Sequence, residues 1–365
     1  MSEVLPMYKE LIKPLLFLMD AENAHDWAIW IASKTNHSEI LQHIVRRLYG
    51  VADAKSSEQI WGLHFKNPLG LAAGFDKNGT TPRAMQALGF GFVEVGSITA
   101  HSSIGNPKPR AFRLPKDHSL INRMGLNNEG AARIIERLKK LQLDIPLGVN
   151  IAKTNDPTIE GGAAVEDYIE SYLLAQQVAD YITINISCPN TGEGKTFEDP
   201  GALSELLAGI KQKASQVDPP AKQQGISFSS TYAHVPTTVK FSVDTTHKDL
   251  VKLVSICEDY GIDGYVATNT SNSREGLLHS QQELSAIGRG GLSGRAIAKR
   301  SLEMTRWLSE ELAGGKPIIS VGGIDSVHSA LERLEAGAHL LQIYTGLIYE
   351  GPGLVSNIAK ARNRN

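Results

Sequence analysis

An apolar run and a polar tail follow each other in Tyr181-Ile182-Thr183-Ile184-Asn185-Ile186-Ser187-Cys188-Pro189-Asn190-Thr191. The first four residues are β-branched or aromatic and predict a short buried strand. The tail places two amides, two hydroxyls and a thiol at the carboxyl end of that strand, where an α/β barrel carries its catalytic groups. Pro189 and Asn190 are equally typical of a plain turn. Taken alone, the stretch leaves a polar turn and a catalytic loop open.

Composition excludes several classes of protein. The chain has 365 residues, 41% hydrophobic content and a formal net charge of −2. This suits one large barrel with an appendage or two medium domains, and it gives no electrostatic case for nucleic acid. Its two cysteines, Cys188 and Cys257, predict no disulfide framework, and no Cys/His cluster has the spacing of a metal site. Cys257 falls at helical spacing with Leu253 and Val254 and is expected in the core. There is no P-loop and no glycine-rich dinucleotide motif after a strand.

From about residue 60 the pattern alternates strand, loop and helix. Eight strands alternating with amphipathic segments favour a (β/α)8 TIM barrel over an open sheet. The polar segment Pro219–Pro236 is expected to be an exposed excursion before the fifth strand. The predicted strands are Gly70–Gly74, Phe92–Thr99, Leu147–Ala152, Tyr181–Ser187, Thr238–Val243, Gly264–Thr270, Pro317–Gly323 and Leu340–Thr345.

Residues 1–50 predict helices instead. Leu11, Leu15 and Leu18 form one apolar stripe, and Asp20 or Asn23 is a candidate cap for the helix after it. We favour a membrane-facing helical hairpin over a subdomain that only packs on the barrel. The expected organisation is a helical membrane and access subdomain over 1–50 and a barrel over 51–365. No signal peptide or spanning segment is predicted, so a peripheral protein on the cytoplasmic face of the membrane is expected.

Almost every predicted strand ends in a candidate ligand group. Two of these are lysines, Lys77 and Lys240, and an inward lysine is a poor choice for packing because an unpaired buried charge is costly. The glycine-containing ends Gly322-Gly323 and Thr345-Gly346 could form a phosphate cradle after strands seven and eight. An FMN site explains this set better than a nicotinamide site, because a lysine beside the flavin would stabilise the negative charge of the reduced ring.

These residues carry a resemblance to a known family. The chain resembles dihydroorotate dehydrogenase, and specifically its membrane-linked, quinone-reducing class 2, over nearly its whole length. The motifs that carry the resemblance are Asn67 to Gly74 with Asp76-Lys77, Gly105-Asn106-Pro107 through Arg113-Leu114, Ile121 to Gly125, Asn185 to Thr191, Ala267 to Thr270, Gly290 to Gly294 and Val321 to Gly323.

The resemblance implies roles for individual residues. Cys188 would be the base that accepts a proton from dihydroorotate, and His25 and Arg113 would be polar groups of a quinone tunnel. Orotate would be held by Lys77, Asn122, Asn185, Asn190, Asn269 and Thr270. FMN would contact Ala73, Gly74, Lys77, Ser97, Asn150, Asn185, Lys240, Thr268, Gly294, Gly323, Tyr344 and Thr345.

The chain departs from the class 2 pattern at a few positions. Cys188 stands where class 2 members carry serine, and cysteine is the choice of the soluble class 1 branch. Leu126 also looks like class 1, and Phe241-Ser242-Val243-Asp244 replaces the usual Ile-Ala-Pro-Asp. The expected function is oxidation of dihydroorotate to orotate in de novo pyrimidine (UMP) biosynthesis, with electrons passing through FMN to a membrane quinone. The alternatives are a related flavoenzyme with another dihydropyrimidine or a soluble acceptor, and a catalytically silent flavin-binding barrel.

Overall fold

The computed structural model describes residues 8–51, 57–187, 197–216 and 234–362 of the chain. Within them, eight parallel strands close into a barrel in the order β10-β12-β13-β3-β4-β7-β8-β9, which confirms the predicted fold class. Every strand is buried along its whole length, as expected where helices cover the outside and side chains fill the inside. The strands are β3 (Leu69–Leu71), β4 (Phe92–Ile98), β7 (Leu147–Ile151), β8 (Tyr181–Asn185), β9 (Thr237–Phe241), β10 (Gly264–Ala267), β12 (Ile318–Val321) and β13 (Leu340–Ile343).

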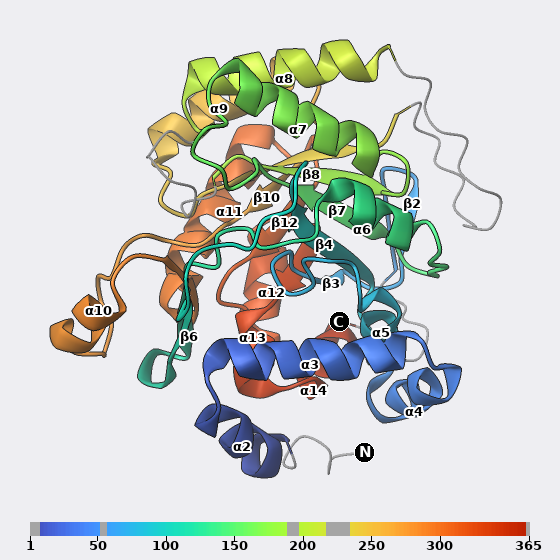
Figure 1. Cartoon of the computed structure of the whole chain (residues 1–365), viewed down its shortest axis with the longest axis vertical. Coiled ribbons are helices and arrows are strands. Elements are labelled where there is room, and N and C mark those ends of the chain that lie inside the picture. Colours follow the sequence, from blue (N-terminus) through green and yellow to red (C-terminus); the bar gives the residue numbers. More distant parts are fainter. Residues whose placement is uncertain (1–7, 52–56, 188–196, 217–233, 363–365) are drawn as a thin grey trace.

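Helices surround the barrel and bury one apolar stripe each against it (Figure 1). In α9 this stripe is Leu250, Leu253, Val254 and Cys257, and the complete burial of Cys257 confirms it as a core residue. The helices are α5 (Pro82–Leu88), α6 (Ala131–Leu138), α7 (Gly162–Ala175), α8 (Pro200–Ala214), α9 (His247–Tyr260), α11 (Ala298–Leu312), α12 (Val327–Glu335), α13 (Thr345–Glu350) and α14 (Gly353–Arg362).

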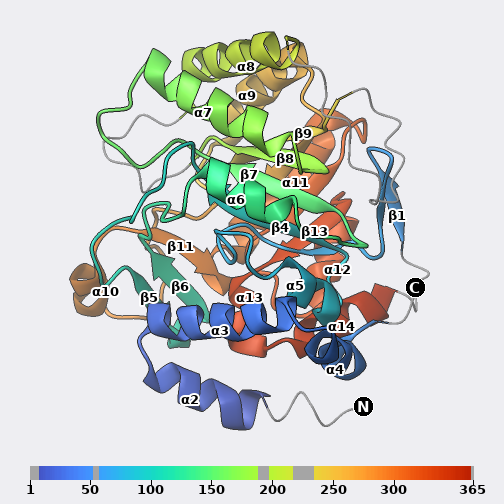
Figure 2. The same ribbon diagram turned by 45° about the vertical axis from the view of Figure 1, so that its right-hand side comes forward.

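The N-terminal helices form a layer at one end of the molecule. A π-helical turn η1 (Tyr8–Ile12) leads into α2 (Lys13–Leu18), followed by α3 (Ala21–Asn36) and α4 (Glu39–Tyr49). Pro14 lies in the first turn of α2, where its missing N–H costs no hydrogen bond. Asp20 caps α3, because its Oδ1 accepts from the amides of Glu22 and Asn23. Figures 1 and 2 show α3 lying across the C-terminal helices α13 and α14.

Apolar side chains remain exposed on this layer. Leu18, for example, is 86% exposed, which is costly unless another apolar surface covers it. None of the described helices is both long enough and apolar enough to cross a membrane. The exposed large apolar residues of the layer are Leu11, Leu15, Leu18, Met19, Trp27, Trp30, Ile31, Ile40, Leu41, Ile44 and Leu48.

Two small antiparallel sheets were not predicted. A hairpin of β1 (Glu58–Ile60) and β2 (Leu63–Phe65) precedes the barrel. The second sheet joins β5 (Ala111–Leu114), β6 (Ser119–Asn122) and β11 (Gly291–Gly294), and it protrudes beside α10 (Gln281–Ile287) in Figure 2. The short turns η2 (Pro115–Asp117) and η3 (Arg295–Ile297) flank its strands. Most of the predicted excursion Pro219–Pro236 lies outside the described residues.

A carboxylate lies in the barrel interior. Glu94 of β4 has no exposed surface, and four side chains donate hydrogen bonds to it. Asn150 Nδ2 reaches Oε1 at 2.9 Å, and Gln342 Nε2 reaches Oε2 at 2.8 Å. The hydroxyls of Tyr181 and Thr183 donate to Oε2 at 2.9 and 3.1 Å. These donors come from three further strands, so one carboxylate joins four strands of the barrel.

We therefore expect Glu94→Gln to destabilise the barrel. The amide would present a donor to groups that are themselves donors, and losing hydrogen bonds to a buried charge costs about 2–3 kcal/mol. Thermal unfolding followed by circular dichroism should show a midpoint several degrees below that of the wild type. Glu136→Gln, on the exposed face of α6, is the matched control and should leave the midpoint unchanged. Equal midpoints for the two variants would contradict this role of Glu94.

Candidate active site

The carboxyl ends of the strands converge on one cavity, here called the central cavity. It has a volume of about 150 Å³ and combines lysine, amide and hydroxyl groups with small residues. Its walls come from six barrel strand ends, from the β5–β6–β11 sheet and the segment after β6, from the start of α3 and from α13. The predicted site residues that line it are His25, Ala73, Gly74, Lys77, Ser97, Asn122, Asn185, Lys240, Asn269, Thr270 and Tyr344.

A second cavity, the glycine-loop cavity, opens from the first and has a volume of about 80 Å³. The two share Ala73, Lys240, Asn269, Thr270, Ser293 and Tyr344, so they are parts of one depression. Predicted cofactor residues that line this second part are Thr268, Gly294, Gly323 and Thr345. Gly322 and Gly346 line it as well, which brings together the two loops predicted to hold a phosphate.

Free polar groups face the glycine-loop cavity. Among the described residues, the amides of Gly323 and Gly346 have no backbone acceptor. The Oε1 of Gln342, which also lines this cavity, is buried and accepts no hydrogen bond from the described part of the chain. Unsatisfied buried groups of this kind are rare and mark a place where a ligand supplies the missing partners. The donor set fits the phosphate and the amide-rich ring of a flavin nucleotide.

The two lysines are held differently. Lys77 Nζ donates to the carbonyl oxygen of Gly74 at 2.8 Å. Burial lowers the pKa of Lys77 to about 8, nearby Asp26 opposes this change, and Arg110 adds to it. Burial also lowers the pKa of Lys240, whereas Glu94 below it raises that pKa and so favours the charged ammonium. Both lysines line the central cavity, and Lys240 also lines the glycine-loop cavity.

Three amide side chains form a chain across the cavity floor. Asn269 Nδ2 donates to Asn185 Oδ1 at 3.0 Å, and Asn185 Nδ2 donates to Ser97 Oγ at 3.2 Å. Ser97 in turn donates to Asn150 Oδ1. Asn150 has no exposed surface and lines neither cavity, and its Nδ2 donates to Glu94 Oε1. Among the predicted cofactor residues, it is therefore the one placed in the core.

An apolar cavity of about 330 Å³ lies between the N-terminal helices and the barrel. It shares Ala21, His25, Leu120 and Ile348 with the central cavity, so apolar and polar spaces meet at these residues. Its other walls come mainly from α3, α5 and α13, with Phe17, Ala28 and Phe75 among the lining residues. The predicted tunnel residues His25 and Arg113 both line it.

His25 lies at the junction of the two cavities. Its ring packs edge-on against Phe75, with centroids 5.3 Å apart, and lies 6.3 Å from the ring of Tyr344. Burial and nearby Lys77 lower the pKa of His25 to about 3, so its imidazole is neutral at physiological pH. Arg113 donates to the carbonyl oxygen of Met19 at 2.8 Å and covers the ring of Phe17.

Two predicted residues, Cys188 and Asn190, lie outside the described part of the chain. Of the departures from the class 2 pattern, Leu126 lines the central cavity with a positive φ of 53°. Asp244 points away from it and accepts hydrogen bonds from Ser271 Oγ and the amide of Asn272.

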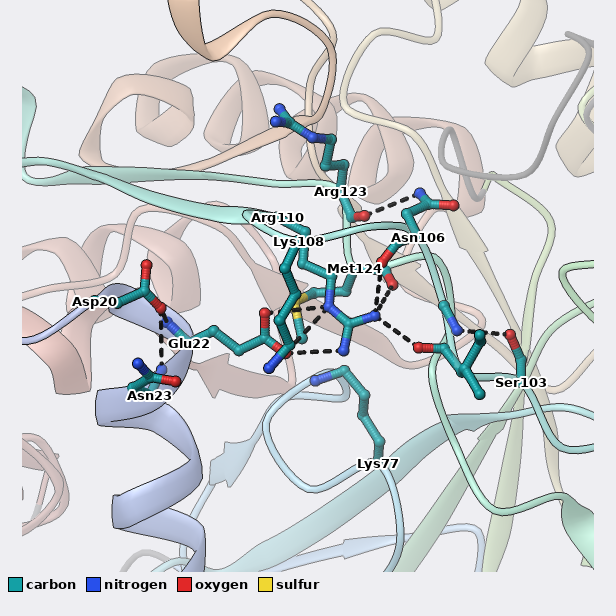
Figure 3. Close-up of polar contacts among 12 residues, drawn as sticks. Asp20, Glu22, Asn23, Lys77, Ser103, Asn106, Lys108, Arg110, Arg123 and Met124 are labelled. Atoms are coloured by element: carbon teal, nitrogen blue, oxygen red, sulfur yellow. Dashed lines mark hydrogen bonds and ion pairs between the residues drawn. The ribbon is translucent and has the colours of Figure 1, made fainter.

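Sequence reasoning missed several residues of the site. Glu94 is a carboxylate within an otherwise apolar predicted strand. Because an unpaired buried charge is costly, it could have been singled out in the same way as Lys77 and Lys240. Glu22 and Arg110 form a buried ion pair beside the central cavity (Figure 3), but 88 positions separate them and no pattern joins the two. Ser293, whose hydroxyl contacts Thr345 Oγ1 at 3.0 Å, comes from β11, a strand that was not predicted.

Known proteins are similar to this chain in sequence and in fold. The chain is 41% identical to the "Dihydroorotate dehydrogenase (quinone)" of Proteus mirabilis over 355 residues, which are 96% of this chain and 99% of the relative. It is also 41% identical to the protein of that name from Chloroflexus aurantiacus, over 99% of this chain and 97% of the relative. The structure of ligand-free DHODH from Eimeria tenella matches with a TM-score of 0.82 and 33% identity, over 93% of each chain.

A second structure from Eimeria tenella, DHODH in complex with ferulenol, matches with a TM-score of 0.80 and 32% identity, over 93% of this chain and 89% of that one. The sequence profile of the family described as dihydroorotate dehydrogenase matches residues 56–364. This match spans the barrel and all of its strand ends. The chain belongs to the dihydroorotate dehydrogenase family.

Proposed function

We propose that this protein oxidises dihydroorotate to orotate in de novo pyrimidine (UMP) biosynthesis and passes the electrons through FMN to a membrane quinone. The observation that carries the proposal is the junction of three spaces: the glycine-loop cavity opens into the central cavity, which meets the apolar cavity at His25. A cofactor, a polar substrate and an apolar acceptor each have a matching space. Family membership and relatives named for a quinone support the same assignment.

The family is flavin-dependent, and the residues present fit FMN in particular. Gly323 and Gly346 offer amides to a phosphate, while Lys240 and the free Gln342 Oε1 offer charge and an acceptor to the ring. Bound FMN would supply the acceptor for a hydride. The residues that we propose hold it are Ala73, Gly74, Lys77, Ser97, Asn185, Lys240, Thr268, Gly294, Gly323, Tyr344 and Thr345, with Asn150 acting through Ser97.

Dihydroorotate would occupy the remaining part of the central cavity. Lys77 offers a positive charge to the substrate carboxylate, and the amides of Asn122, Asn185 and Asn269 offer donors and acceptors to its ring. Thr270 and Asn190 complete the proposed set. Cys188 would accept the proton from C5 of the substrate while the hydride leaves from the neighbouring carbon.

The N-terminal layer would deliver the quinone. Its exposed apolar side chains suit contact with a membrane, and the apolar cavity beneath α3 suits an isoprenoid acceptor. We therefore propose that residues 1–50 form a membrane and quinone-access subdomain and that residues 51–365 form the FMN-binding barrel. Peripheral attachment to the cytoplasmic face of the membrane belongs to the same proposal. His25, neutral at physiological pH, and Arg113 would orient the quinone head.

Anaerobic half-reactions test the proposal directly. Purified protein should contain one non-covalent FMN per chain, and dihydroorotate should bleach its absorbance. Parallel addition of a quinone, fumarate and NAD should restore the colour fastest with the quinone. Bleaching only by another dihydropyrimidine, or reoxidation only by a soluble acceptor, would favour a related flavoenzyme. Bound flavin that no dihydropyrimidine bleaches would indicate a silent barrel.

Cys188→Ala should retain FMN but slow flavin reduction by dihydroorotate about a hundredfold or more, the usual scale for the loss of a general base. Cys188→Ser should keep some activity, with a rate that continues to rise at high pH because a hydroxyl gives up its proton less readily than a thiol. Stopped-flow absorbance measures both rates. Cys257→Ala, which alters the buried thiol of α9, is the control and should reduce at the wild-type rate. Normal reduction in Cys188→Ala would show that another group takes the proton.

Ala28→Trp should block access of the quinone through the apolar cavity and leave flavin reduction by dihydroorotate unchanged. Ala28 lines the apolar cavity, and an indole there would fill space that a quinone needs. We expect kcat/KM for a long-chain quinone to fall about tenfold or more, the scale of a steric misfit in an apolar pocket, with flavin reduction by dihydroorotate unchanged. Ser33→Trp, on the same helix but outside the cavity lining, is the matched control. Equal quinone kinetics in both variants would place the acceptor elsewhere.

A further inference from the structure

A buried ion pair fastens α3 to the rim of the central cavity (Figure 3). Arg110 Nη2 lies 2.8 Å from Glu22 Oε1, and Arg110 Nε lies 3.1 Å from each oxygen of that carboxylate. Glu22 is 4% exposed and Arg110 is 7% exposed, so neither charge has water as an alternative partner. Lys108, which is itself exposed, adds a contact of 3.1 Å to Glu22. The hydrogen bonds from Arg110 and Lys108 outweigh burial and hold the pKa of the Glu22 carboxyl below its usual value.

The other amino group of Arg110 holds two loops together. Its Nη1 donates to the carbonyl oxygens of Ile104 at 2.7 Å and Asn106 at 2.9 Å, and more weakly to that of Met124 at 3.5 Å. The loops also bond each other directly, because the amide of Asn106 donates to the carbonyl of Met124. One guanidinium therefore connects α3, the segment 103–110 and the segment 122–126.

The connected segments form walls of the proposed binding spaces. Asn122, Met124, Gly125 and Leu126 line the central cavity from one side, and Glu22 with its neighbours Ala21 and His25 lines it from another. Ala21 and His25 also line the apolar cavity. A displacement of α3 relative to the segment 122–126 would therefore change both spaces at once.

The two loops pack so closely that they have little free volume in which to move. A Cβ at Gly105 would lie 2.2 Å from the carbonyl oxygen of Met124 and 2.6 Å from Arg110 Nη1. A Cβ at Gly125 would lie 2.6 Å from the backbone nitrogen of Asn106. Both glycines have positive φ, so the close approach of the two loops depends on residues without side chains.

Glu22 supplies the negative charge that balances the cations around this contact. Figure 3 shows the ammonium of Lys77 directed toward the guanidinium of Arg110, and Lys108 lies against the same carboxylate. Arg110 and Lys108 both contact Glu22, and Lys77 lies close enough to Arg110 for the two positive charges to repel each other. Without Glu22, Arg110 would be a buried cation without a carboxylate partner, which is strongly unfavourable.

We propose that Glu22 is a positioning residue that, through Arg110, sets the segment 122–126 against α3 and so fixes the substrate and quinone spaces together. This inference rests on the proposed function. It assigns to the N-terminal helices a part in substrate binding as well as in access of the acceptor. Removing those helices would therefore impair both half-reactions, because the barrel would lose the counter-ion of Arg110.

The test compares Glu22→Gln with Glu258→Gln in the full-length holoenzyme. Glu258 also pairs with a cation, Lys316 at 2.8 Å, but at the opposite end of the barrel. Orotate titration of the flavin absorbance should show a dissociation constant about tenfold higher in Glu22→Gln, the effect of losing about 1.4 kcal/mol. The KM for quinone should rise in the same variant. Amide hydrogen exchange over residues 103–126 should accelerate. Glu258→Gln should match the wild type in all three measurements.

Two further variants keep the test decisive. Glu22→Asp retains the charge on a side chain that is shorter by one methylene. It should change the orotate dissociation constant, the quinone KM and the exchange rate less than Glu22→Gln does. It replaces Glu22→Gln in the test if that variant does not fold. Arg110→Lys keeps a cation near Glu22 but cannot reach three carbonyls, so exchange should accelerate in segment 122–126. Wild-type orotate affinity, quinone KM and exchange in folded Glu22→Gln would overturn the proposal, because a purely structural role would lower only the unfolding midpoint.

The exchange measurement separates this inference from the proposed function. If dihydroorotate does not reduce the flavin of the wild-type protein, the assigned reaction is wrong. Faster exchange over 103–126 in Glu22→Gln would still support the link between α3 and the loops, and unchanged exchange would refute it.

Discussion

The closed ring of parallel hydrogen bonds is the constraint on which the rest of the molecule depends. The last strand, β13, pairs with the first, β3, from Leu341 opposite Leu69 to Ile343 opposite Leu71. Because every strand in the ring runs the same way, all eight end at one rim. Residues as distant in sequence as Lys77, Asn185 and Lys240 therefore line one cavity. The closed ring of strands is therefore what places these side chains in one cavity.

Charge inside the barrel is tolerated because it is partnered. Glu94 accepts hydrogen bonds from four side chains and also favours the charged form of Lys240 above it. Glu94 thus opposes the effect of burial on the pKa of Lys240 and is itself not an isolated charge in the core. A flavin that gains electrons in the central cavity would become negative next to that lysine. The network that joins four strands of the barrel thus also acts on a lysine of the candidate site.

Alternating apolar runs and helical segments were enough to predict all eight barrel strands, because each strand is buried on both faces. The sheet of β5, β6 and β11 escaped prediction because its strands are short and Asn122 pairs with Gly291, far along the chain. Asn150 shows a similar limit for the site. The sequence indicates that it lies near the end of a strand, but not whether its side chain reaches the cavity or stays buried inside the barrel. Ion pairs such as Glu22 with Arg110 depend on docking of separate elements and leave no local pattern.

The proton acceptor and the electron acceptor depend on different parts of this chain. The proposed base, Cys188, follows β8, whereas the apolar cavity is built by α3, α5 and α13. Exchanging a hydroxyl for a thiol at position 188 would alter proton transfer, whereas the described walls of the apolar cavity come from other elements. A class 1-like base is therefore physically compatible with a class 2-like acceptor path. Among the described residues, the central and apolar cavities share Ala21, His25, Leu120 and Ile348, and Glu22 beside them contacts Arg110, so a change on one side can reach the other.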